Sequence, residues 1–235
     1  MQRASPKLTI QTPGNHMMGS LYKTTYQSAA LAFMLYVLLF LFVDRPVSMW
    51  LHACCADNQI HQAGVFFSTL AYGAYVHLAL ALAFVAVLVA DPGRERPWTG
   101  PVLYVCLSLA IAWCVGDGLK YLLGRYRPVM LFEDNLYGFH FFSTQWRMNS
   151  TPSGHTLRAF AICTSLSVLF RRYAGYFIGL AILIALSRIA VTDHYVSDVV
   201  FGAFIGIFSA LWTAALFLRD EGKKHSEGTG GRFKK

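Results

Sequence analysis

Six apolar blocks divide this sequence, and each is close to the roughly 20 residues that a membrane-spanning helix needs. They cover residues 24–43, 65–90, 101–123, 152–170, 173–191 and 199–218. Charged residues make up only 14% of the chain, against about 25% in a soluble globular domain. The sequence therefore predicts an all-α integral membrane protein with six transmembrane helices. The second block is longer than one span needs, so we expect it to tilt or to begin in the interface.

The lysine and arginine residues predict the orientation of these spans, because cytoplasmic loops carry an excess of both. With a cytoplasmic N-terminus, thirteen of the 20 basic residues fall on the cytoplasmic side. The other seven are Arg45, Lys120, Arg125, Arg127, Arg147, Arg158 and Arg188. We therefore expect both termini in the cytoplasm, with residues 1–23 as one tail and residues 219–235 as a basic, disordered tail. The net charge of +8 then reflects topology and predicts no nucleic-acid partner.

The five cysteines give no functional signal. Cys106, Cys114 and Cys163 fall inside apolar blocks, where a small buried side chain is common. No cluster of cysteine and histidine has the spacing of metal ligands. We therefore expect neither a metal site nor a cofactor.

Two cations lie at the end of the third block. In a helix, Lys120 and Arg127 are two turns apart and face the same way, and Pro128 would then end that helix. Two cations on one face suit the oxygens of a phosphate group. The alternative is that both side chains only extend to the membrane interface.

The sequence NSTPSGH predicts the start of the fourth spanning helix. We expect Thr151 to be its N-cap and Pro152 to be its first residue. The amide groups of Ser153, Gly154 and His155 would then point out of the helix end and form an anion site. The alternative is an ordinary capped helix with an incidental histidine.

A histidine and an aspartate lie between the last two blocks. His194 and Asp198 are four residues apart, so on a helix the carboxylate can accept a hydrogen bond from one ring nitrogen and leave the other free as a nucleophile. Ser187 lies on the same face, and Arg188 adds a cation. A structural hydrogen bond is the alternative. All three segments fall on the same membrane face under the predicted topology, which favours a shared functional site.

These three segments, taken in order, resemble the signature of the type 2 phosphatidic acid phosphatase (PAP2) superfamily. The signature reads Lys-x6-Arg-Pro, Pro-Ser-Gly-His and Ser-Arg-x5-His-x3-Asp, and every one of its positions is filled here. The resemblance covers residues 24–218 and implies a PAP2-type helical bundle with phosphatase activity.

The resemblance also implies roles for these residues. His194 would attack phosphorus and form a phosphohistidine, Asp198 would orient it, and His155 would act as general acid and base. The phosphate-binding residues would be Lys120, Arg127, Arg188, Ser153, Gly154 and Ser187. These cations would make a metal unnecessary.

The leading hypothesis is a lipid phosphatase in a bacterial inner membrane, with its active site on the periplasmic face. Candidate substrates are undecaprenyl diphosphate, phosphatidylglycerol phosphate, phosphatidic acid and the phosphates of lipid A. Phosphotransfer from one lipid to another is an alternative, and a non-catalytic lipid-binding or transport protein is a weaker one. The oligomeric state is left open.

Two further arginines, outside the signature, could contact the substrate headgroup. They are Arg158, one turn after His155, and Arg147 in the long loop 129–151. This loop is rich in aromatic residues, which indicates either an interfacial belt or a lid over the lipid headgroup.

Overall fold

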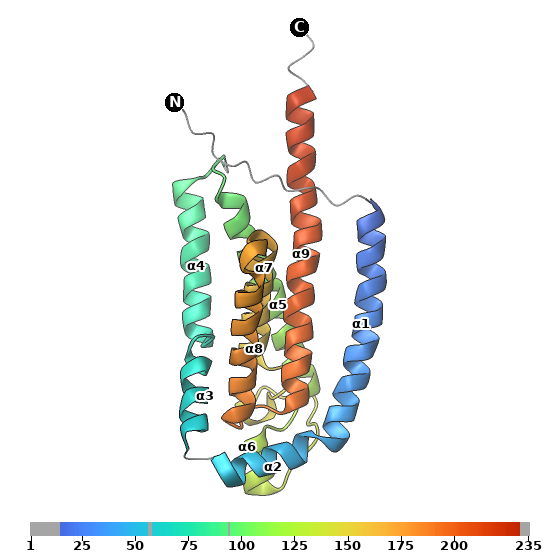
Figure 1. Ribbon diagram of the computed structural model, residues 1–235, viewed down its shortest axis with the longest axis vertical. Coiled ribbons are helices and arrows are strands. Elements are labelled where there is room, and N and C mark those ends of the chain that lie inside the picture. The colour runs from blue at the N-terminus through green and yellow to red at the C-terminus, as the bar shows by residue number, and fades with distance from the viewer. Residues whose placement is uncertain (1–14, 56–57, 94, 231–235) are drawn as a thin grey trace.

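The computed structural model of this chain describes residues 15–55, 58–93 and 95–230, and these residues form a helical bundle (Figure 1). The longer helices are α1 (Asn15–Phe42), α2 (Asp44–Cys55), α3 (Gln59–Thr69), α4 (Gly73–Ala90), α5 (Thr99–Leu123), α7 (Gly154–Leu169), α8 (Ala174–Ala190) and α9 (Val196–Gly230). Shorter ones are α6 (Pro128–Asp134), η1 (Trp146–Met148) and η2 (Arg171–Tyr173). Helices α5, α7, α8 and α9 lie at the centre, while α1 and α4 flank them.

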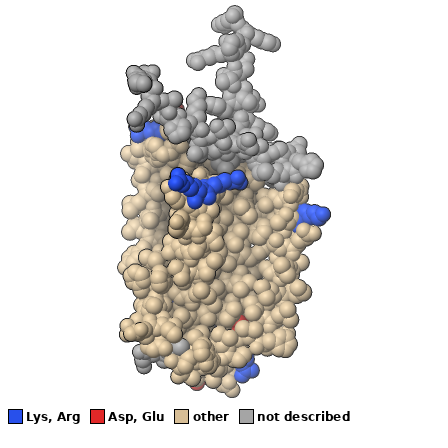
Figure 2. Space-filling model, viewed as in Figure 1, with Lys and Arg blue, Asp and Glu red and all other residues tan. Residues whose placement is uncertain are grey.

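The surface of the bundle is apolar enough to lie in a bilayer. Five segments of the described chain are long and apolar enough to cross a membrane: Gly19–Phe42, Gln59–Ala90, Thr99–Leu123, Arg171–Ala190 and Val196–Phe217. Large apolar side chains stay exposed on them, such as Phe33 at 67% and Val89 at 78%. Figure 2 shows lysine and arginine atoms towards the two ends of the visible face, with a broad band of other residues between them. The chain is therefore a multi-pass membrane protein.

The fourth predicted span corresponds to α7, which has only 16 residues. At 1.5 Å per residue it is ~24 Å long, shorter than the roughly 30 Å of a hydrocarbon core. Its flanks are covered by α5, α8 and α9, so it needs no full-length apolar surface of its own. The count of six spans stays a prediction.

The second predicted span is two helices, and the single-helix prediction was wrong. Helix α3 ends at Thr69, and Tyr72 adopts an extended conformation before α4 begins. The break frees the carbonyl group of Ala71, which is 3% exposed, and Arg158 donates to it from both Nε and Nη2 at 3.2 and 3.1 Å. Irregular backbone at membrane depth is tolerated where protein groups satisfy it, as they do here.

Helices α7 and α9 approach closely through two glycines one turn apart. A Cβ atom on Gly202 would lie 2.8 Å from the carbonyl oxygen of Ser153, and one on Gly206 would lie 2.5 Å from that of Leu157. Small residues at this spacing let helix backbones pack together in membranes. This packing lets the Ser153 amide donate to the Asp198 carbonyl at 3.1 Å, which joins two of the predicted motifs.

Helix α5 ends at Leu123, where the third predicted block ends, and does not continue to Pro128, so Lys120 and Arg127 do not share one helix face. Gly124 has a φ of +55°, and a Cβ atom there would lie 1.8 Å from the carbonyl oxygen of His140. Glycine is favoured in this left-handed conformation and ends the helix. Arg127 is extended, and Pro128 begins α6 instead of ending α5.

Helical structure extends into both predicted tails. Helix α1 begins at Asn15, inside the predicted tail 1–23, and α9 continues to Gly230 through most of the predicted disordered tail. Residues 219–230 contain no proline, and their glutamate and lysine residues favour helix. Residues 1–14 and 231–235 of the two tails lie outside the described ranges.

Candidate active site

His194 lies in the turn between α8 and α9, not on a helix with Asp198 as predicted. Helix α9 begins two residues later, at Val196, so Asp198 stands in its first turn. The imidazole is 2% exposed, and its Nδ1 lies 3.8 Å from Asp198 Oδ2. This distance is too long for a hydrogen bond, and among the described residues Nδ1 has no other hydrogen-bond partner. The predicted hydrogen bond between the two residues is therefore not made in this structure.

The carboxylate of Asp198 is fully buried and held by neighbouring donors. Oδ2 accepts from the amide of Tyr195 at 3.0 Å and from Ser150 Oγ at 2.5 Å. Oδ1 accepts from Thr151 and Arg125. These contacts fix the position of the Asp198 carboxylate next to His194.

Burial lowers the pKa of His194, and the positive charge of Arg127 lowers it further, while Asp198 opposes the shift. A pKa below the ordinary value of about 6.5 leaves the imidazole neutral at pH 7. A neutral imidazole keeps the free electron pair that a nucleophile needs.

Helix α7 begins at Gly154 with Ser153 as its N-cap, so the prediction of Thr151 as N-cap and Pro152 as first residue was wrong. The Ser153 amide is already bonded to the Asp198 carbonyl, and its hydroxyl accepts from Thr156 Oγ1 at 3.1 Å. The unpaired amide groups at this helix end therefore start at Gly154.

Two cations converge on the start of α7. A Cβ atom on Gly154 would lie 3.0 Å from Lys120 Nζ and 3.2 Å from Arg158 Nη1. Lys120 is also 3.4 Å from Asp117 Oδ1. Glycine here keeps the space between helix end and cations open, and the cations add to the positive end of the helix dipole. This arrangement is suited to binding an anion.

Arg127 and Arg188 bring two more buried cations to the same place. Arg127 donates from Nε to the Trp146 carbonyl at 2.9 Å, and its guanidinium lies 4.4 Å from the centre of the Trp146 ring. Burial lowers the pKa of Arg127 to about 10, so it stays charged at neutral pH. Arg188 pairs with Asp193, and its buried Nε has no hydrogen-bond partner within the described part of the chain. Both arginines, together with Arg158, lie close enough for their charges to act on His155.

Two of the predicted site residues are engaged elsewhere. The buried hydroxyl of Ser187 donates to the Ile184 carbonyl at 2.6 Å within α8. The side chain of Arg147 is 43% exposed and pairs with Glu133 and Asp134 of the long loop. The structure thus gathers His155, His194 and four cations but leaves Ser187 and Arg147 with partners of their own.

The long loop folds against the end of α5. The Tyr126 amide donates to the Gly138 carbonyl at 3.1 Å, and the Arg127 amide donates to the Arg147 carbonyl at 2.9 Å. Phe141 and Phe142 are 59% and 66% exposed, as an interfacial belt requires.

Sequence reasoning missed Arg125 and Asp44, which form a buried ion pair next to Asp198. The sequence did hold a signal for this pair. A cation and a carboxylate at the ends of membrane spans are costly unless each has a partner. Arg125 lies inside the first motif but at none of its signature positions.

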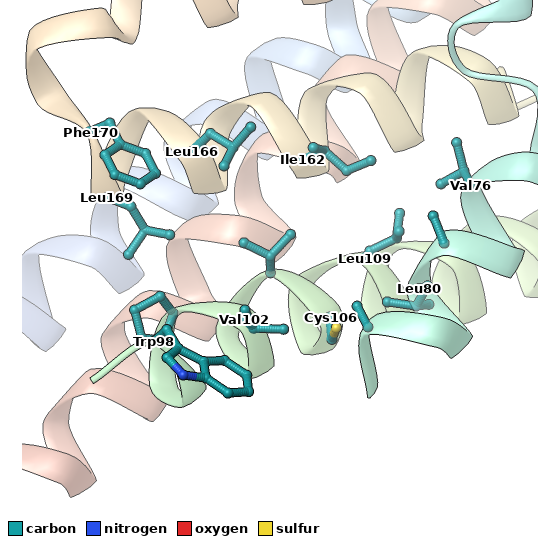
Figure 3. Close-up of a pocket in the computed structure, with 14 residues that line it drawn as sticks. Val76, Leu80, Trp98, Val102, Cys106, Leu109, Ile162, Leu166, Leu169 and Phe170 are labelled. Atoms are coloured by element: carbon teal, nitrogen blue, oxygen red, sulfur yellow. The ribbon is translucent and has the colours of Figure 1, made fainter. Parts of the chain in front are cut away.

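A separate apolar cavity of about 470 Å³ lies between α4, α5 and α7 (Figure 3). Its lining includes Leu80, Val102 and Leu166, with Trp98 and Phe170 at one end. No charged residue of the described chain lines it, so it is suited to hydrocarbon and not to phosphate.

Comparisons with known proteins point to one family. The model of the PAP2 superfamily matches residues 101–221. A lipid A 1-phosphatase of Rhizobium johnstonii is 33% identical over 122 residues, which cover 52% of this chain and 49% of that protein. One of Rhizobium etli is 32% identical over 122 residues, which cover 52% of each. The chain thus spans about half the length of these curated relatives.

A solved structure supports the same fold. The crystal structure of Aquifex aeolicus LpxE is similar with a TM-score of 0.54 and 23% sequence identity, covering 73% of this chain and 94% of that one. At this identity the likeness concerns the arrangement of helices alone.

Proposed function

Because the chain belongs to the PAP2 superfamily, we propose that it is a membrane phosphatase that hydrolyses a lipid phosphate or diphosphate through a phosphohistidine. One observation carries the proposal: His194 is buried, and the charges of Arg127 and Arg188 act both on it and on His155 in the first turn of α7, where Lys120 lies beside Gly154. Cations and helix-end amides stabilise the charge that spreads over the phosphoryl oxygens in the transition state.

The proposed reaction has two steps. In the first, the free ring nitrogen of His194 bonds to phosphorus, the bond from phosphorus to the leaving oxygen breaks, and His155 gives that oxygen a proton. In the second, His155 takes a proton from water, whose oxygen attacks phosphorus and releases inorganic phosphate from His194. Asp198 stabilises the positive charge on the imidazole during the attack.

The substrate is proposed to be a bacterial lipid phosphate. Because two relatives are named lipid A 1-phosphatase, we propose a phosphate of lipid A ahead of undecaprenyl diphosphate, phosphatidylglycerol phosphate and phosphatidic acid. We propose that Arg158, which is 8% exposed and lies beside Gly154, contacts a second phosphate of such a headgroup.

Phosphate release from these four lipids, presented in detergent micelles, tests the proposal. We expect release from at least one of them to be undiminished in excess EDTA, because Lys120, Arg127 and Arg188 neutralise the phosphoryl charge. Orthovanadate should inhibit, since it mimics the five-coordinate phosphorus of the transition state. Activity that is lost in EDTA and regained only with Mg²⁺ would contradict this mechanism, and transfer of the phosphate to another lipid would favour a phosphotransferase.

We further propose that the site faces the periplasm of a bacterial inner membrane. The supporting observation is that the site lies at the end of the bundle opposite the start of α1 and the end of α9 (Figure 1), where the positive-inside rule places few basic residues.

Cysteine labelling tests this orientation. In a background with Cys54→Ser and Cys55→Ser, the exposed loop variant Thr144→Cys should react with an impermeant maleimide in intact cells. The matched variant Glu95→Cys, in the α4–α5 connection, should react only after permeabilisation. Labelling of Glu95→Cys alone in intact cells would reverse the orientation.

A further inference from the structure

Arg125 is a buried cation between α5 and α6 that the three-part signature does not include. Its side chain has no exposed surface. Its Nη2 donates to Asp44 Oδ2 at 2.6 Å, and its Nη1 donates to Asp198 Oδ1. Taking an ion out of water is costly, so a buried arginine persists only where its partners compensate that cost.

Five aromatic rings surround the same guanidinium and form an aromatic cage. The distances from Arg125 Cζ to the ring centres range from 4.5 to 5.9 Å. The rings belong to Tyr36, Phe40, Tyr137, Phe139 and Tyr195. Aromatic faces attract a cation, most strongly when both are shielded from water. The rings come from α1, from the long loop and from the turn before α9, so three distant segments meet at one side chain.

Asp44, the first residue of α2, ties the junction between α1 and α2 to the start of α9. Its Oδ1 accepts from the Ser197 amide at 3.0 Å, and its Oδ2 accepts from Ser197 Oγ at 2.5 Å. Arg125 Nη1 also donates to Ser197 Oγ at 2.6 Å. The residue next to Ser197 is Asp198, so this network holds the helix turn that carries the carboxylate beneath His194.

We propose that Arg125 is a positioning residue, which fixes Asp198 so that its Oδ2 faces His194. Arg125 and Thr151 both donate to Oδ1, while Oδ2 is the oxygen that faces His194 Nδ1. Without the guanidinium the carboxylate keeps its bonds from Ser150, Thr151 and the Tyr195 amide but loses its ion pair, so the orientation of the carboxylate and of the imidazole is less well fixed. This inference rests on the proposed function, because it assigns Arg125 a place in that reaction.

The same network makes α1 and the first residue of α2 part of the support for Asp198. Tyr36, Phe40 and Asp44 all precede residues 101–221, the part matched by the family. Asp44 binds Nη2 of Arg125, and this contact leaves Nη1 to bind Asp198. The site therefore depends on a segment that carries no signature residue.

A double-mutant cycle on kcat tests the inference. Arg125→Gln should lower kcat by about 100-fold and leave KM nearly unchanged, because the lost interaction acts on the reacting imidazole and not on substrate binding. Combined with Asp198→Asn, it should cause little further loss, since both changes remove the same interaction. Additive losses, or a raised KM with unchanged kcat, would show that Arg125 does not act through Asp198.

Two further variants separate positioning from folding. Arg45→Gln removes an exposed cation that lies 5.5 Å from the Tyr137 ring of the same cage, and it should leave kcat and thermal stability unchanged. If Arg125→Gln gives no monodisperse protein in detergent, Asp44→Asn tests the same inference. This variant keeps Arg125 but removes the carboxylate that binds its Nη2. That variant should lower kcat by about tenfold at unchanged KM, and an unaltered kcat would overturn the inference.

The measurements distinguish an error in the role of Arg125 from an error in the proposed function. A native protein that releases no phosphate from any lipid of the panel would contradict the proposed function itself. An active native protein whose Arg125→Gln variant is folded and equally active would contradict only the role of Arg125.

Discussion

Phosphate release should fall by roughly 10⁴-fold or more when His194 is replaced with alanine, because the reaction then has no nucleophile. His194→Ala should still bind orthovanadate non-covalently, since Arg127, Arg188 and the start of α7 stay in place. The measurement is kcat on the best lipid of the panel, in detergent, together with the melting temperature of both proteins.

The matched control is His140→Ala in the exposed part of the long loop. It removes an imidazole of the same face and should leave kcat unchanged. A His194→Ala protein that keeps its melting temperature and retains a tenth or more of the native kcat would exclude His194 as the nucleophile.

Replacing His155 with alanine should trap the enzyme between the two steps. A diphosphate lipid carries a good leaving group, so forming the phosphohistidine needs little acid assistance, whereas its hydrolysis needs a base to activate water. The His155→Ala enzyme should therefore accumulate labelled protein when the terminal phosphate of the lipid is radioactive, while phosphate release falls by about 10²- to 10⁴-fold. The label should be stable in alkali and lost in acid.

Two other proteins are the controls for that experiment. The His194→Ala/His155→Ala double variant should take up no label, and the native enzyme should show only a transient trace. If the His155→Ala enzyme neither accumulates label nor loses activity, another group activates the water.

The membrane class and the three motifs could be predicted because they depend on local sequence. Apolar blocks of sufficient length predicted α5, α8 and most of α1 and α9, since burial in a bilayer requires little more than length and composition. The motifs around His155 and His194 could be found because their residue types are costly at the ends of spans unless they have a function.

Helix boundaries within the motifs could not be predicted, because they depend on contacts distant in sequence. Gly124 ends α5 where the backbone meets His140, which lies 16 residues later along the chain. Pro128 was expected to stop a helix, yet it begins α6, and proline suits both positions. Local propensity alone does not choose between such alternatives.

The sequence also could not predict which buried charges pair with each other. Arg125 and Asp44 are 81 residues apart, and nothing in either segment specifies that they pair. Likewise Ala71 accepts from Arg158 only because the break between α3 and α4 frees its carbonyl. Charge pairs across a bundle arise from helix packing, which this sequence determines through features as small as Gly202 and Gly206.

The position of the covalent phosphate tests the mechanism most directly. The His155→Ala enzyme would be mixed with a diphosphate lipid, quenched in alkali, digested and examined by tandem mass spectrometry under conditions that preserve the P–N bond. The mechanism predicts one phosphoryl group on the peptide that contains His194, attached to that imidazole. A phosphoryl group on any other residue, with His194 unmodified, would contradict it.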